Sequence, residues 1–189
     1  KAGVFSTIII GILLVDLFII DTKFIDPRPH AELEQNLQSN ATVEYLKQQQ
    51  GIFRVFPMGD LYQHETSFQY YGLQSVGGYS PAKLKIYQTV IDSCMYRGAD
   101  PAFPLNMNVV NMLNVKYLVA SGQLPPDKFT LSYTDETKRW LTYENSNALP
   151  RAFFVSRAVV ANNDNEVFTA LNSREFNPRT TAIIEKALT

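Results

Sequence analysis

The N-terminal part of the chain is an almost unbroken apolar run, which limits what the chain can fold into. The run extends from Val4 to Ile20 with the sequence VFSTIIIGILLVDLFII, and polar residues follow from Asp21 onward. A helix needs about 20 apolar residues to cross the roughly 30 Å hydrocarbon core of a bilayer. The run therefore predicts the end of a membrane span, followed by a water-facing domain.

Two other interpretations of this run stay open. A signal-peptide core is usually about 7–15 residues long and ends at a small-residue cleavage site, whereas Asp21, Thr22 and Lys23 follow here. The run is also compatible with a buried helix or strand of a soluble fold. A carboxylate is costly in lipid, so we place Asp16 near the far end of the span, within reach of the interface or a neighbouring helix. Lys1 is the single basic residue before the run in this sequence, so basic residues do not orient it.

Composition restricts the rest of the chain. Its 189 residues suit one domain plus an anchor, and 46% hydrophobic residues suffice for a core. A net charge of −1 gives no long-range field that would recruit nucleic acid, so we expect no nucleic-acid partner. With Cys94 as the single cysteine, an internal disulfide is excluded. Two histidines and one cysteine make a structural zinc site improbable, and we expect neither a metal nor a cofactor.

Hydrophobic spacing and turn residues predict a mixture of helices and strands. Helices are expected at 29–50 with a break at Ser39 or Asn40, at 80–95 with Ser80 as N-cap and Pro81 in the first turn, at 106–113 and at 166–171. Strands are expected at 52–56, 115–120, 129–133, 139–143 and 152–160. Residues 61–79 are expected to form a loop, and 181–187 a last strand or the start of a helix. This order predicts an α+β (mixed α/β) fold in which helices pack on one mixed sheet.

A search for catalytic residues finds no complete set. The sequence lacks a nucleotide-binding glycine loop and a GxSxG nucleophile motif. His64, Glu65 and Asp60 are close enough in sequence for an acid/base cluster, but we favour a solvated loop. Cys94 lies among apolar residues, which favours a buried, inert thiol.

Other polar residues have structural interpretations. We interpret Asp92 and Asp100 as cap or turn residues. The segment 162–165, Asn-Asn-Asp-Asn, resembles a cation-binding loop but lacks the spacing of a calcium loop, so we favour a helix cap.

Three segments carry a resemblance to a known family. They are GGYSPAKL at 77–84, LNVKYLV at 113–119 and YENSNALPRAF at 143–153, and the strand RVFP at 54–57 precedes them. In this order they resemble the extracytoplasmic domain of YfhO-type bacterial membrane proteins. The resemblance covers about 52–184, and its second and third segments are the more specific ones. The N-terminal apolar run agrees with the membrane helix that precedes this domain in the family.

The resemblance implies a location and a role. Family members are polytopic proteins, similar in plan to GT-C glycosyltransferases, that are thought to use polyprenyl-phosphate-linked sugars to decorate cell-envelope polymers such as lipoteichoic acid. Their catalytic carboxylate lies in an early loop between membrane helices, outside this sequence. We therefore expect residues 1–21 to end a transmembrane helix in a bacterial cell membrane. Residues 22–189 would then form an extracytoplasmic domain that is incomplete at its C-terminus, with an accessory or acceptor-binding role.

Four residues in or near these segments are candidates for ligand binding: Arg54, Tyr79, Lys116 and Arg151. The functional interpretation is a groove that binds an anionic polyprenyl-phosphate sugar or envelope polymer. The structural interpretation is that Lys116 pairs with a residue such as Glu144, and that each arginine clamps a loop carboxylate bidentately. The alternative function is a non-catalytic module that binds an envelope protein or polymer.

Overall fold

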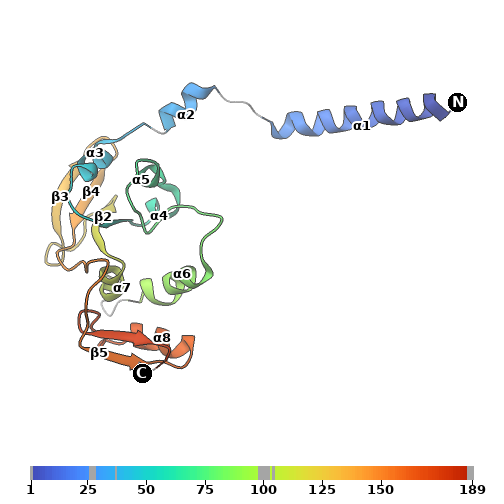
Figure 1. The fold of residues 1–189 in the computed structure, drawn as a ribbon. Coiled ribbons are helices and arrows are strands. Elements are labelled where there is room, and N and C mark those ends of the chain that lie inside the picture. The colour runs from blue at the N-terminus through green and yellow to red at the C-terminus, as the bar shows by residue number, and fades with distance from the viewer. Residues whose placement is uncertain (1, 26–28, 37, 98–102, 104, 187–189) are drawn as a thin grey trace. The chain divides into compact units, whose positions relative to one another are not determined.

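A computed structural model describes residues 2–25, 29–36, 38–97, 103 and 105–186. The chain divides into two compact units, Lys1–Gln38 and Ser39–Thr189, which are described separately (Figure 1). The sequence analysis placed the boundary between the membrane helix and the water-facing domain after residue 21, where the apolar run ends. That boundary stays a prediction.

The first unit contains the long apolar helix. Helix α1 spans Ala2–Phe24, so it is about 35 Å long at 1.5 Å per residue. Its apolar side chains are exposed, and it is long and apolar enough to cross a membrane. The helix continues past Ile20, which places Asp16 about two turns before its end rather than near the end.

The helical segment predicted at 29–50 is broken at Asn40, one of the two expected positions. Helix α2 spans His30–Asn36 and α3 spans Ala41–Lys47. The side-chain oxygen of Asn40 accepts a hydrogen bond of 2.8 Å from the backbone N–H of Val43, so Asn40 caps α3.

The second unit is built on a mixed four-stranded sheet, which confirms the predicted α+β class. Its strands are β1 (Arg54–Pro57), β2 (Val115–Ala120), β3 (Thr130–Asp135) and β4 (Trp140–Glu144). The order is β1-β2-β4-β3, with β1 and β2 parallel and the other pairs antiparallel. The predicted hairpin is therefore formed by β3 and β4.

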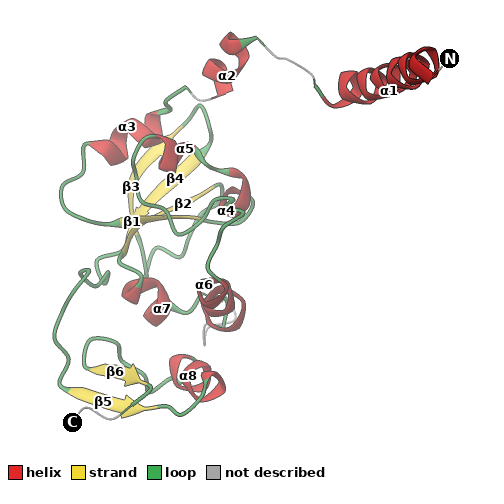
Figure 2. Ribbon diagram, turned by 45° about the vertical axis from the view of Figure 1, so that its right-hand side comes forward, coloured by secondary structure: helices red, strands yellow, loops and turns green. Residues whose placement is uncertain are grey.

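Helices cover both faces of this sheet (Figure 2). Along β2, Tyr117 and Val119 lie in one core and Leu118, between them, lies in the other. Val43 of α3 and Phe68 of α5 (Ser67–Tyr70) pack in the core that contains Tyr117. The other core receives side chains from α4 (Leu61–His64), the π-helix η1 (Ile91–Met95), α7 (Met107–Met112) and α8 (Asp164–Leu171).

Residues 61–79, which the sequence predicted to be a loop, contain the short helices α4 and α5. The Gly77-Gly78 turn packs tightly against α4, because a Cβ on Gly77 would lie 2.8 Å from the backbone oxygen of Tyr62. The N–H of Gly78, at φ +94, donates to the same oxygen over 2.5 Å.

Because this turn is docked on α4, the following helix begins at a later residue than predicted. Helix α6 spans Lys85–Val90 and continues into η1, so the prediction that Ser80 caps a helix with Pro81 in its first turn is wrong. The hydroxyl of Tyr87 donates to the carbonyl of Val76 over 2.9 Å, which ties the first turns of α6 back to the docked segment.

The structure contains a second, smaller sheet, whereas the sequence predicted a single sheet. It pairs β5 (Arg157–Val160) with β6 (Thr181–Ile184) in parallel. The strand predicted at 152–160 is shorter because its partner has only four residues. Asn163 accepts a bond from the N–H of Glu166 over 3.0 Å and caps α8, as the sequence predicted. Asp92 lies within η1 rather than at a cap or turn, and Asp100 lies outside the described residues.

Candidate functional site

Two of the four sequence-predicted residues meet at the turn before β2, which we call the arginine turn (Arg54, Asn114 and Arg151). The Arg54 guanidinium donates to the carbonyl of Leu113 over 2.9 Å. Arg151 donates from Nε to the side-chain oxygen of Asn114 over 2.7 Å, and from its terminal nitrogen to Gln74. The partners are carbonyl and amide oxygens, so the prediction that each arginine clamps a loop carboxylate is wrong.

The arginine turn is a strained piece of backbone held by side chains. Asn114 is buried and adopts a left-handed conformation with φ 59, and its amide also donates to the carbonyl of Leu149 over 2.8 Å. Burial, and next the neighbouring charge of Arg151, lower the pKa of Arg54. The guanidinium groups of Arg54 and Arg151 therefore lie close together. Both already donate hydrogen bonds that hold the turn.

The other two predicted residues lie apart from this turn. Lys116 Nζ is 3.6 Å from a carboxylate oxygen of Glu144, the partner that the sequence analysis named, and 5.2 Å from the ring centroid of Tyr117. Tyr79 is 77% exposed. No hydrogen bond or ion pair within the described part of the chain joins Lys116 or Tyr79 to the arginine turn. A ligand-binding role for the four residues stays a prediction.

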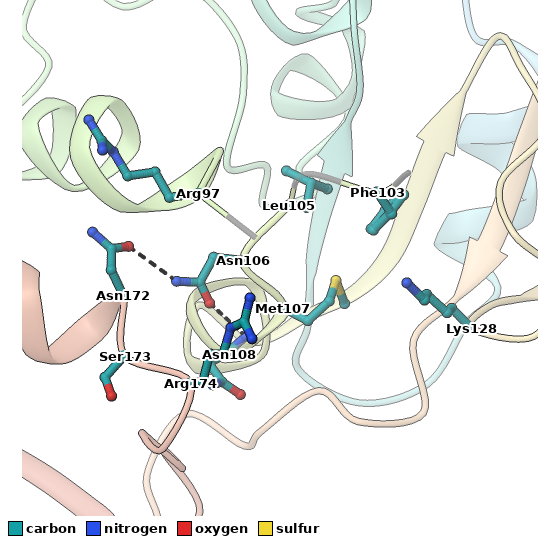
Figure 3. Close-up of a pocket in the computed structure, with 10 residues that line it drawn as sticks. All are labelled: Arg97, Phe103, Leu105, Asn106, Met107, Asn108, Lys128, Asn172, Ser173 and Arg174. Carbon is teal, nitrogen blue, oxygen red and sulfur yellow. Dashed lines mark hydrogen bonds between the residues drawn. The ribbon is translucent and has the colours of Figure 1, made fainter. Parts of the chain in front are cut away.

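A pocket of about 420 Å³ lies where η1, α7 and α8 approach one another, and Figure 3 shows its lining. Its described lining contains three cations, three asparagines, a serine and three apolar residues. We call it the cation pocket: Arg97, Phe103, Leu105, Asn106, Met107, Asn108, Lys128, Asn172, Ser173 and Arg174.

The asparagines form the frame of the cation pocket. Asn106 caps α7 by accepting from two backbone N–H groups, and its amide donates to the carbonyl of Leu171 over 3.0 Å. The amide of Asn172 donates to the carbonyl of Ser93 over 2.9 Å. Because these bonds connect α7, α8 and η1, the pocket wall is fixed by groups that are already satisfied.

Two of the three cations of the cation pocket, Arg97 and Arg174, have guanidinium groups that are available. Within the described chain, the guanidinium groups of Arg97 and Arg174 have neither an ion-pair nor a hydrogen-bond partner, and the described lining contains no carboxylate. Lys128 Nζ lies 5.7 Å from the ring centroid of Phe103. Guanidinium groups recognise phosphate and carboxylate by paired hydrogen bonds. The arrangement suits an anion that also carries an apolar part.

The sequence analysis did not find the cation pocket. Arg97 follows η1, Lys128 precedes β3 and Arg174 follows α8, so the three cations come from connecting segments far apart in the sequence. The spacing of residues within a single helix or strand cannot indicate such a cluster. The one local signal was Asn106, whose capping role in a predicted helix marks where the pocket wall begins.

A second pocket, of about 410 Å³, contains residues that the sequence analysis weighed as an acid/base cluster. We call it the tyrosine pocket: Gly59, Asp60, Tyr62, Gln63, His64, Gln88, Ile91, Asp92 and Tyr96. The structure brings Asp60 and His64 to one pocket with Asp92, whereas Glu65 accepts a bond from the N–H of Ser67 over 2.8 Å. Among the described residues, no group of three His, Cys, Asp or Glu side chains is placed to hold a metal ion.

Cys94 is fully buried in the core, as expected from sequence. Burial raises the pKa of its thiol, which disfavours the thiolate. The thiol is therefore a packing group rather than a nucleophile.

Comparisons of the chain with protein-family models, curated proteins and solved structures find no match. The resemblance to YfhO-type proteins thus depends on the sequence segments alone and stays a prediction.

Proposed function

We propose that this chain is the water-facing, extracytoplasmic domain of a polytopic bacterial glycosyltransferase similar to YfhO-type proteins. In this proposal the domain binds the phosphate of a polyprenyl-phosphate-linked sugar or of an envelope polymer, and the chemistry takes place in another part of the protein. The observation that carries the proposal is the cation pocket, which contains apolar side chains and two guanidinium groups that have no partner within the described chain.

The N-terminal helix supports a membrane location. Helix α1 exposes large apolar side chains such as Phe5, Leu14 and Phe18, which are 66%, 62% and 70% exposed. A helix with apolar residues on all sides suits hydrocarbon better than water. A protein anchored in a membrane has access to a phosphate ligand whose prenyl chain lies in that membrane.

The chemistry of the cation pocket supports a phosphate-bearing amphiphile over a neutral ligand. Arg97 and Arg174 offer planar donor groups, and Phe103, Leu105 and Met107 provide apolar contact. Each charge-assisted hydrogen bond contributes about 1.5–3 kcal/mol. Loss of one guanidinium is thus expected to weaken binding roughly 10-fold or more.

The test uses the full chain in lipid nanodiscs and isothermal titration calorimetry. Geranyl phosphate is the probe, geraniol is its uncharged counterpart, and titrations into empty nanodiscs correct for partitioning into lipid. We expect saturable binding of geranyl phosphate that Arg174→Gln weakens roughly 10-fold or more. Arg157→Gln, at an exposed position outside the pocket, is the matched control and should bind as the wild type does.

Equal binding of geranyl phosphate and geraniol, or binding that is unchanged in Arg174→Gln, would contradict the proposal. Glycerol phosphate as a second titrant separates the two sources of phosphate. Binding of glycerol phosphate as tight as that of geranyl phosphate assigns the pocket to a polymer phosphate, whereas tighter binding of geranyl phosphate assigns it to the lipid carrier.

An apolar surface favours the alternative function, a non-catalytic module that binds an envelope protein. A pocket of about 360 Å³ is lined mainly by apolar residues: Met112, Phe153, Val155, Val167, Leu171, Phe176, Pro178, Thr181, Ala182 and Ile183. Phe154, next to it in sequence, is fully exposed. On this alternative, Phe154→Glu abolishes co-purification of an envelope protein and leaves geranyl phosphate binding intact; unchanged co-purification would count against it.

A further inference from the structure

The connection that leads into α6, residues 79–86, exposes large apolar side chains to solvent. Tyr79, Leu84 and Ile86 are 77%, 71% and 67% exposed, and Figure 1 shows this connection at the outside of the second unit. Single exposed apolar side chains are common on soluble domains, whereas several gathered in one short segment indicate an interaction site. Segment 79–86 is therefore a candidate contact surface.

Hydrogen bonds on both sides hold this segment in place. Before it, the N–H of Gly78 donates to the backbone oxygen of Tyr62 over 2.5 Å. After it, the hydroxyl of Tyr87 donates to the carbonyl of Val76 over 2.9 Å. Because both ends are fixed to the domain, ordering the segment on a partner costs little conformational entropy.

The segment is basic as well as apolar. Lys83 and Lys85 flank Leu84, and residues 66–91 contain no aspartate or glutamate. Lys85 is exposed, and Lys83 is half-buried with its Nζ 5.7 Å from the ring centroid of Tyr62. Neither lysine forms an ion pair within the described chain. The segment therefore presents positive charge to an anionic partner.

We infer that residues 79–86 contact the surface of an anionic lipid bilayer, with their apolar side chains inserted into its interface. Tyrosine suits the boundary between headgroups and hydrocarbon, because its ring is apolar and its hydroxyl is polar. Leucine and isoleucine side chains are stabilised when they leave water. Lysine side chains extend toward anionic headgroups. Apolar side chains combined with cations are typical of protein segments that lie in a membrane interface.

The N-terminal helix favours a bilayer over a protein as the partner. Helix α1 is long and apolar enough to cross a membrane. A domain tethered to a membrane meets that membrane at a high effective concentration, so a short segment of weak intrinsic affinity suffices for contact. The inference rests on the proposed membrane location of α1, and it does not depend on the ligand of the cation pocket.

The experiment measures contact between this segment and lipid in the full chain. Ala82→Cys, at an exposed position of the segment, is labelled with the fluorophore NBD, whereas Cys94 is fully buried and stays unlabelled. The chain is reconstituted at one copy per nanodisc of phosphatidylcholine and phosphatidylglycerol, with or without doxyl-labelled lipid as quencher. Size exclusion isolates the discs that carry the chain, which separates failure of α1 to insert from failure of the segment to contact lipid.

We expect the doxyl lipid to quench the label at position 82. Ala158→Cys, at an exposed alanine of β5, is the matched control, and its label should stay unquenched. The double variant Leu84→Gln/Ile86→Gln, made in the Ala82→Cys chain, should reduce quenching to the control level. Its melting temperature should change little, because both side chains are exposed.

A second double variant tests the ionic part of the contact. Lys83→Gln/Lys85→Gln should weaken the contact about 5-fold for each lysine on the anionic nanodiscs. On nanodiscs of phosphatidylcholine alone it should leave the quenching unchanged, because the lysines there have no anionic headgroup to meet.

Three results would overturn the inference: no quenching at position 82, equal quenching at position 158, or undiminished quenching in Leu84→Gln/Ile86→Gln. A blue-shifted but unquenched label at position 82 would also overturn it, because that result assigns the segment to a protein contact instead of lipid.

Discussion

The cation pocket and the tyrosine pocket are both bordered by the segment around η1 and carry opposite charges. Asp92, within η1, lines the tyrosine pocket, and Arg97, which follows η1, lines the cation pocket. A π-helix inserts an extra residue into a helical turn, and such segments are frequent at functional sites. One short segment thus supplies a carboxylate to one pocket and a guanidinium to the other.

The two pockets also differ in which groups are left unpaired. In the cation pocket the buried amides are satisfied, and the guanidinium groups of Arg97 and Arg174 are not paired within the described chain. In the tyrosine pocket, the side chains of Asp60 and His64 have no hydrogen bond within the described chain, and the hydroxyl of Tyr62 is buried without one. The comparison indicates unpaired guanidinium groups on a frame of hydrogen-bonded asparagines in one pocket, and carboxylates beside a buried phenol in the other.

The largest expected effect follows from removing the frame of the cation pocket. Asn106 is buried, caps α7 and bonds to Leu171, so Asn106→Ala should lower the free energy of unfolding by about 2–3 kcal/mol. Geranyl phosphate binding should weaken with it. Denaturant unfolding measures the loss, with Asn165→Ala on the exposed side of α8 as control. A change below about 0.5 kcal/mol would show that the capping network is unimportant.

Charge reversal tests the difference between the pockets without disturbing the frame. Arg97→Glu places a carboxylate in the cation pocket, so geranyl phosphate affinity should fall well beyond 10-fold. Because the guanidinium of Arg97 has no partner within the described chain, the melting temperature should change little. Calorimetry and thermal unfolding of the same sample check both expectations, and a large drop in melting temperature would assign Arg97 a structural role.

The arginine turn provides a third comparison. The guanidinium of Arg151 is hydrogen-bonded within the fold, whereas those of the cation pocket are not. Arg151 bonds to Asn114 and Gln74, so Arg151→Ala should cost about 1–1.5 kcal/mol of stability. The affinity of the cation pocket for geranyl phosphate should stay unchanged. Denaturant midpoints measure the cost; unchanged stability together with weakened geranyl phosphate binding would restore the groove that the sequence analysis proposed.

The smallest expected effect is the contribution of buried tyrosines to the pH dependence of stability, which appears only at alkaline pH. Burial raises the pKa of Tyr62, Tyr87 and Tyr96 in the folded chain, whereas an unfolded tyrosine has a pKa near 10. The unfolded chain therefore loses these protons first, and stability should fall as the pH rises above about 10. Denaturant unfolding across pH 8 to roughly 11 measures this fall. It should be shallower in Tyr62→Phe, and an identical slope would contradict the burial of that hydroxyl.

Much of the fold was predictable because its signals are local. Strand β2 has a continuous apolar run, α7 has Asn106 as its cap, and α8 has Asn163. Errors occurred where tertiary contacts decide the outcome. Docking of the Gly77-Gly78 turn on Tyr62 moves the start of α6 to Lys85, which neither Ser80 nor Pro81 reveals.

The sites were less predictable than the fold. The pairing of Lys116 with Glu144 was predicted because an ammonium in an apolar strand needs a nearby carboxylate. The cation pocket was missed because its charges come from three connecting segments that only the packing of η1, α7 and α8 brings together. Asp60 and His64 were noticed, but Asp92 and the unpaired hydroxyl of Tyr62 emerge only from the folded chain.

The most direct test of the proposed function is an NMR titration of the full chain in nanodiscs with geranyl phosphate, read from side-chain amides. The amides of Asn108 and Asn172 report on the cation pocket, and that of Gln88 reports on the tyrosine pocket. We predict saturable shifts of Asn108 and Asn172, with Gln88 unmoved and no shifts with geraniol. Unmoved asparagine amides, or a shift confined to Gln88, would contradict a phosphate-binding role for this domain.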